Sequence, residues 1–145
     1  MNLDDFFLGF GSSLAATLFV WAFCEAKKNR ALRAKYGRCV GKYEGFCYED
    51  GKQKSHPESD AVVTYLRDNV LKLRLTEKAG PVWEGILTME TEDNGTVVFQ
   101  YVAPEGKYEF GFKRCIWNGK DKLYLVGERL GGYHYEVLIK PPAAV

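Results

Sequence analysis

The sequence predicts a membrane-anchored all-β protein, with an N-terminal transmembrane helix and about eight antiparallel strands in an up-and-down meander closed as a barrel. Three observations predict this fold: an uncharged apolar run near the N-terminus, a basic segment directly after it, and turn signals that divide the remaining chain into short alternating segments. A length of 145 residues favours one domain. A hydrophobic content of 46% and a net charge of +1 exclude a disordered polyelectrolyte and a globally basic nucleic-acid binder.

The first element is a run of 19 residues without a charge, from Phe6 to Cys24, preceded by Asp4 and Asp5. As a helix at about 1.5 Å per residue it spans roughly 28 Å, close to the hydrocarbon thickness of a bilayer. A cleaved signal peptide is one alternative, but such a peptide begins with a basic region and this flank is acidic. A buried core helix is the other, but few soluble folds hide a helix that is apolar on all sides.

The second element is a basic segment, residues 25–38, with six Lys or Arg against Glu25. Basic residues directly after a span predict that the following domain faces the cytoplasm and that the N-terminus lies outside, in a single-pass protein of an inner or plasma membrane. Good helix formers continue to Tyr36, and Gly37 is a C-terminal stop signal. Residues 1–38 therefore predict an acidic tail, a span and a basic helical stalk near anionic headgroups.

The third element, residues 39–145, is predicted to be a cytoplasmic β domain. Pairs such as Asn94-Gly95 and Asn118-Gly119 supply the positive φ angles of tight hairpins, and seven turn signals predict eight strands. The expected strands are 39–48, 61–67, 70–77, 82–91, 96–103, 108–117, 122–129 and 133–140. The 61–67 segment also fits a helical face. Short connections favour a meander, which closes into a barrel or curls into a sandwich, and we favour the barrel.

No residue constellation indicates catalysis or metal binding. The four cysteines form no C-x-x-C pair, and His56 and His134 are the only histidines. Nucleotide-binding glycine loops and the common hydrolase motifs are absent from the sequence. We therefore expect a protein that is not an enzyme and that carries neither cofactor nor metal, with reduced cysteines acting as small buried hydrophobes.

Arg114 is the residue that points most directly to a ligand. By alternation it shares a strand face with Phe110, Phe112 and Ile116, a face that we expect to point inward. A guanidinium there needs an anionic partner, because an unpaired buried charge costs several kcal/mol. The alternatives are a position at the barrel rim or an internal pair with Glu128.

Aromatic residues near Arg114 suggest a site for a flat ligand, since aromatic and Arg groups in a barrel mouth can hold a planar base. The candidate ligand-binding residues are Arg114, Tyr108, Tyr133, Tyr135 and Trp117. The alternative is that these rings fill the core.

This layout resembles the membrane-anchored lipocalin-like β-barrel effectors of bacterial cyclic-oligonucleotide antiphage signalling. Gly41-Lys-Tyr43-Glu-Gly45 at the start of the barrel and Trp83-Glu-Gly85 at the start of a later strand are similar to such domains. The resemblance implies a lipocalin-like barrel that binds a cyclic dinucleotide, oligomerises and then damages the inner membrane. That family usually has two spans, whereas one is predicted here.

Two functions follow. The first is a sensor-effector whose barrel binds a small anionic ligand and whose span forms a homo-oligomer through small residues at four-residue spacing, such as Gly9 and Ser13. The second is a non-catalytic, membrane-tethered scaffold for a protein partner, which predicts a packed barrel with an exposed apolar patch on its outside. A lipid carrier is a third reading and needs an open apolar lumen. Membrane lipid is an expected partner of both the sensor-effector and the scaffold. We expect neither DNA nor RNA as a partner in any of the three cases.

Overall fold

The computed structural model describes residues 3–49, 52–78, 80, 82–102, 110–129 and 132–142, and the side chains within these ranges except 3–13, 49, 101–102, 110, 128–129 and 132–134. The elements are α1 (Leu3–Tyr36), the 3-10 helix η1 (Gly37–Cys39), β1 (Gly41–Glu49), β2 (Lys52–Gln53), β3 (Ser59–Arg67), β4 (Val70–Glu77), β5 (Val82–Met89), β6 (Asn94–Val102), β7 (Phe110–Trp117), β8 (Lys122–Arg129) and β9 (Gly132–Ile139).

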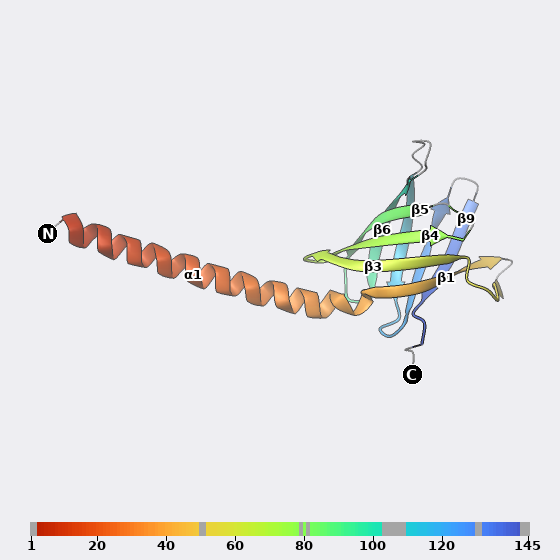
Figure 1. Cartoon of the computed structure of the whole chain (residues 1–145), viewed down its shortest axis with the longest axis horizontal. Helices are drawn as coiled ribbons and strands as arrows, with labels where there is room; N and C mark the ends of the chain where they lie inside the picture. The colour runs from red at the N-terminus through yellow and green to blue at the C-terminus, as the bar shows by residue number, and fades with distance from the viewer. Residues whose placement is uncertain are drawn as a thin grey trace.

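The strands form a closed antiparallel barrel with meander topology (Figure 1). Within the described residues the sheet order is β2-β1-β3-β4-β5-β6-β7-β8-β9, and β1 pairs with β9 to close it. The eight predicted strands all exist and the barrel is confirmed over the sandwich. The 61–67 segment lies in β3, a strand, and the sequence did not predict the short β2, which pairs with β1.

Alternation along β4 shows why these residues form a barrel wall. Leu71, Leu73 and Leu75 are buried inside, while Lys72 and Arg74 lie on the outside. Each buried leucine removes apolar surface from water, at about 1.5–3 kcal/mol per side chain. The burial of this strand thus follows the period-two alternation of its sequence.

β7 turns the opposite face inward from the one that the sequence predicts. Phe112 and Ile116 lie on the outer surface, and Phe112 is 55% exposed. Arg114 lies with them and is exposed. Trp117 and Lys113 point inside instead. The prediction that Arg114 points into the barrel is therefore wrong.

The physical reason is the register of β7 with β8. Trp117 lies opposite Leu123, and Cys115 lies opposite Leu125. Directly opposed residues of antiparallel strands share a face, and both leucines are completely buried. Because β7 carries apolar residues on both faces, its own alternation does not determine which face points into the barrel. The pairing with β8 determines it.

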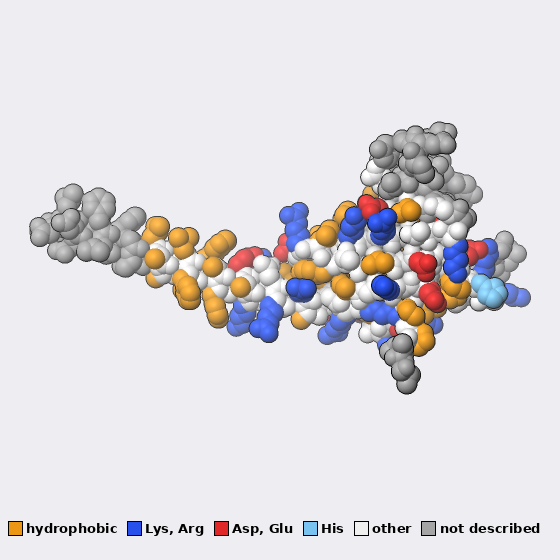
Figure 2. Space-filling model, viewed as in Figure 1, with side chains coloured by type: hydrophobic (Ala, Val, Ile, Leu, Met, Phe, Trp, Pro, Cys, Tyr) orange, Lys and Arg blue, Asp and Glu red, His pale blue; other side chains and the backbone are white. Residues whose placement is uncertain are grey.

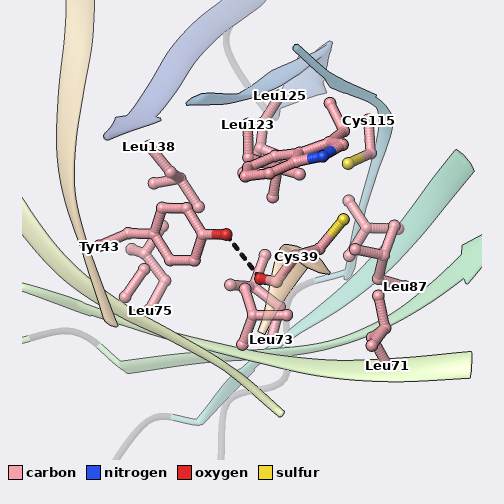
Figure 3. Close-up of a cluster of buried hydrophobic side chains, with 14 of the residues drawn as sticks. Cys39, Tyr43, Leu71, Leu73, Leu75, Leu87, Cys115, Leu123, Leu125 and Leu138 are labelled. Atoms are coloured by element: carbon pink, nitrogen blue, oxygen red, sulfur yellow. Dashed lines mark hydrogen bonds between the residues drawn. The ribbon is translucent and has the colours of Figure 1, made fainter. Parts of the chain in front are cut away.

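Buried side chains from all eight barrel strands meet in the interior, and η1 enters one end (Figure 3). There the hydroxyl of Tyr43 donates a hydrogen bond to the carbonyl of Cys39, both buried. Lys140 Nζ donates to the carbonyl of Arg38 at 2.8 Å and lies 5.2 Å from the ring centroid of Trp117. The chain that leaves α1 thus plugs this end of the barrel.

α1 projects from the plugged end as a long single helix (Figure 1). Its last turns contact the barrel: Tyr36 belongs to the core cluster, Leu32 packs against that cluster, and Lys35 pairs with Glu92 at 3.6 Å. In the described part of the chain, no helix combines the length and the apolar character needed to cross a membrane. Residues 6–13 of the predicted span lie outside the described side chains.

Candidate functional site

Of the five predicted ligand-binding residues, the three whose side chains the structure describes do not converge on one site. Arg114 lies on the outer face of β7, whereas Trp117 is buried in the core, 3% exposed. Tyr135 is half-buried on the outer face, with its ring 4.6 Å from that of Tyr48. Tyr108 and the side chain of Tyr133 lie outside the described residues, as does the side chain of Glu128, the alternative partner of Arg114.

Arg114 and Tyr135 do share one row of the outer surface. Arg114 lies opposite Val126, and Val126 lies opposite Tyr135 on the next strand. Opposed residues have Cβ atoms about 4.5–5.5 Å apart, so the two predicted residues are separated by a single side chain. The structure therefore places this part of the predicted site outside the barrel.

A buried polar cluster lies at the end of the barrel opposite η1. Lys113 Nζ contacts Glu136 Oε2 at 3.4 Å, and Ser59 Oγ donates to Glu136 Oε1 at 2.9 Å. The Lys113 ammonium also lies 5.5 Å from the ring centroid of Phe99. All three polar residues are at least nine-tenths buried, so a carboxylate, an ammonium and a hydroxyl satisfy one another away from water.

Sequence reasoning missed this cluster, and strand parity reveals it only once the inward faces of β7 and β9 are known. Lys113 has the same alternation as Cys115 and Trp117, and Glu136 has the same alternation as Leu138. Ser59 is 2% exposed, so its hydroxyl is closed to a substrate, and this hydroxyl already donates a hydrogen bond to the Glu136 carboxylate. The geometry fits a structural pair rather than a nucleophile with its base.

The described cysteines divide into one exposed thiol and three in more enclosed positions. Burial raises the pKa of Cys39 to about 11 and that of Cys47 to about 12, and it also raises the pKa of Cys115. Cys24, on α1, is exposed. Among the described residues, no group of three or more His, Cys, Asp or Glu side chains could hold a metal ion.

Because the pKa values of these thiols are raised, we expect the free energy of unfolding to fall at alkaline pH. An unfolded thiol ionises near pH 9, whereas Cys39 in the folded chain stays protonated to about pH 11. The unfolded state therefore binds fewer protons in that window, and the free energy of unfolding falls by about 1.4 kcal/mol per pH unit for each buried thiol. Urea midpoints at pH 7.5, 9 and 10 measure this decline. Cys115→Ala should flatten it in part, Cys24→Ser should not, and an unchanged midpoint up to pH 10 contradicts the prediction.

The described part of α1 exposes large apolar side chains to its surroundings (Figure 2). Phe19 is 74% exposed and Trp21 is 64% exposed, and Leu18, Val20 and Phe23 are exposed beside them. At about 100° per residue, the four consecutive residues from Leu18 to Trp21 point in four directions around the helix. Lys and Arg side chains follow nearer the barrel. The helix is therefore apolar all round before it becomes basic.

The outer wall of the barrel also carries an apolar row. Ile86 lies opposite Val98, and Val98 lies opposite Phe112, so three strands place one residue each in the row. The three side chains are between 47% and 55% exposed. Ile116 lies four residues along β7 from Phe112 on the same face, with Arg114 between them. Contiguous exposed apolar side chains of this kind mark interaction surfaces.

Comparisons with protein-family models, with curated proteins and with solved structures find no match to this chain. Its own residues therefore carry the functional assignment.

Proposed function

We propose that this protein is a membrane-anchored, non-catalytic interaction protein. Residues 6–24 of α1 cross an inner or plasma membrane once, with the N-terminus outside. Residues 25–38 lie at the cytoplasmic headgroups, and the barrel is held beneath the membrane to bind a protein partner. The observation that carries the proposal is the exposure of apolar side chains on every side of α1 between Leu18 and Phe23.

Lipid fits this helix better than a single protein partner does. A partner helix covers one apolar stripe, as in a coiled coil, and leaves the opposite face in water. Leu18 and Val20 point about 200° apart, so one stripe cannot include both. A helix that is hydrophobic all round belongs in a protein core or in a bilayer. Self-association of the span through its small residues stays a prediction.

The barrel favours an interaction module over a sensor with an internal ligand. Buried side chains occupy the described interior, and the exposed row Ile86, Val98 and Phe112 lies outside. The scaffold hypothesis expects buried side chains inside the barrel and an apolar patch on its outside, and these described residues support it. The second candidate is the sensor-effector of antiphage signalling that binds a cyclic dinucleotide. Exposed Arg114 favours it as an anion-binding group, and stabilisation of the full chain by a cyclic dinucleotide, lost in Arg114→Ala, would support it.

The anchor is tested by flotation of the full chain with neutral phosphatidylcholine vesicles. The wild-type chain should float with the vesicles. Leu18→Asp with Val20→Asp should remain largely in the dense fraction, because each acid near the middle of a span costs about 2.5–3.5 kcal/mol on insertion.

The matched control adds the same two charges to the barrel wall. Val98→Asp with Phe112→Asp should float like the wild type, since both positions lie on the exposed outer face. Wild-type protein that stays in the dense fraction, or a Leu18/Val20 variant that floats fully, contradicts the anchor.

A further inference from the structure

A basic groove lies where α1 meets the turn between β3 and β4. Its volume is about 380 Å³, within the range of small-molecule sites, roughly 300–1,000 Å³. Two elements that are far apart in the sequence form its walls. The lining residues are Asn29, Arg30, Arg33, Tyr65, Leu66, Arg67 and Asp68.

The groove gathers more positive charge than it neutralises. Arg30, Arg33 and Arg67 line it together with one carboxylate, that of Asp68. Among the described residues, none of the three guanidinium groups has a salt bridge, whereas Lys28 and Lys35 of the same helix do. Three cations brought together against one acid leave the groove with a local excess of positive charge, which an anion would relieve.

The barrel side of the groove is held in place by its own contacts. The hydroxyl of Tyr65 donates to the backbone carbonyl of Asp68 at 3.0 Å. The side-chain amide of Asn69 donates to the carbonyl of Met89 at 2.6 Å, which ties the turn to β5. Arg33 lies 6.0 Å from the centroid of the Tyr65 ring, so helix and strand meet there. Arg67, the last residue of β3, thus lies next to an ordered turn that faces the helix.

We propose that this groove binds a phosphate ester, and specifically the headgroup phosphate of an anionic phospholipid. The guanidinium fork matches the oxygens of a phosphate and forms charge-assisted, often bidentate hydrogen bonds with them. The lipid assignment rests on the membrane anchor proposed above. With the span ending at Cys24, Arg30 lies about 9 Å further along the helix, just beyond a headgroup layer of roughly 5–7.5 Å, so its long side chain has only a short distance to reach back.

The direction of the helix side chains strengthens this assignment. Side chains on an α-helix lean toward its N-terminus, and the N-terminus of α1 lies on the membrane side. Arg30 and Arg33 therefore reach back toward the lipid phosphates, while Arg67 approaches from the barrel. A bound headgroup would fix the orientation of the barrel relative to the bilayer.

The test uses the full chain in neutral detergent with soluble dihexanoyl phosphatidic acid as the probe. The lipid should raise the melting temperature of the barrel. Arg33→Gln with Arg67→Gln should weaken its apparent affinity by at least about tenfold. Both arginines are exposed, so the variant should melt like the wild type without lipid.

The matched control is Lys27→Gln with Arg74→Gln. It also removes one charge from α1 and one from the barrel, at positions that do not line the groove. The control should retain wild-type affinity. A control that weakens binding as much as the groove variant, or no stabilisation by the lipid at all, overturns the site.

A second arm identifies the source of the phosphate. Glycerol 3-phosphate at the same concentration should stabilise the chain much less than the lipid. Equal stabilisation supports a phosphate site but overturns its assignment to a lipid headgroup. Because the anchor is tested on vesicles without anionic lipid, failure of the anchor and failure of the groove are separate results.

Discussion

Glu136→Leu is expected to lower the free energy of unfolding of the barrel by about 3–5 kcal/mol, the usual cost of breaking a buried ion pair on one side. The substitution leaves the Lys113 ammonium buried without this carboxylate, and it removes the acceptor of the Ser59 hydroxyl. Leucine is similar in volume to glutamate, so the loss is mainly electrostatic. Urea unfolding of the full chain in mild detergent, followed by tryptophan fluorescence, measures the change.

The matched variant replaces the whole cluster. Ser59→Ala, Lys113→Met and Glu136→Leu together remove every polar member, and the triple variant should recover to within about 1.5 kcal/mol of the wild type. Exchanging a buried pair for apolar residues of similar size is often neutral or stabilising. A triple variant as unstable as Glu136→Leu alone would mean that lost volume, and not an uncompensated charge, dominates.

Gly127→Ala is expected to destabilise the barrel by at least about 3 kcal/mol, the upper part of the range for overpacking. A Cβ at this position would lie 2.2 Å from the carbonyl oxygen of Phe112 and 2.8 Å from the Cα of Lys113. Both are backbone atoms of β7, opposite Gly127 and its neighbour in the ladder, so no side-chain rotation relieves the clash. The strands must separate locally, which also disturbs Lys113 and its pair.

Gly37→Ala is the control for the loss of a glycine. Nothing lies within 4 Å of a Cβ at this position, and its φ is not positive. The expected change is small, between no effect and a gain of about 1 kcal/mol from a less flexible unfolded chain. Thermal unfolding of both variants, monitored by far-ultraviolet circular dichroism, separates a steric effect from a general one. Equal melting temperatures for the two variants contradict the prediction.

Local chemistry accounts for the strands and turns. Asn118-Gly119 is predicted as a hairpin turn and Gly119 has a φ of 79°, the conformation that such a turn requires. The side chain of Asn118 accepts hydrogen bonds from the backbone of residues 120–122, which completes the turn within five residues. Period-two alternation in β4 is equally local, because leucines and charged residues are cleanly separated. Such signals are readable from the chain because the groups that interact are neighbours in sequence.

The candidate site depends on pairings that no local pattern contains. Phe112 and Trp117 lie on opposite faces of β7, so only one of them can point into the barrel. Trp117 does, because it lies opposite a buried leucine of β8. The same pairing puts Lys113 inside and Arg114 outside. Hydrophobicity alone does not anticipate a buried lysine, because the carboxylate that pairs with it, that of Glu136, lies 23 residues away.

Three features of the sequence predict the order of elements in this protein, a basic helix followed by an eight-strand meander. They are the segregation of charge along the chain, the residues at the turns and the alternation of apolar and polar residues in the strands. These features depend on interactions between residues close in sequence, and the structure agrees with them nearly strand for strand. The inward face of β7, the Ser59–Lys113–Glu136 cluster and the groove between Arg33 and Arg67 arise only when distant segments meet. Closure of β1 on β9 and docking of α1 on β3 bring those segments together. Both contacts form because they remove apolar surface of the strands and of the helix from water, which lowers the free energy of the folded state.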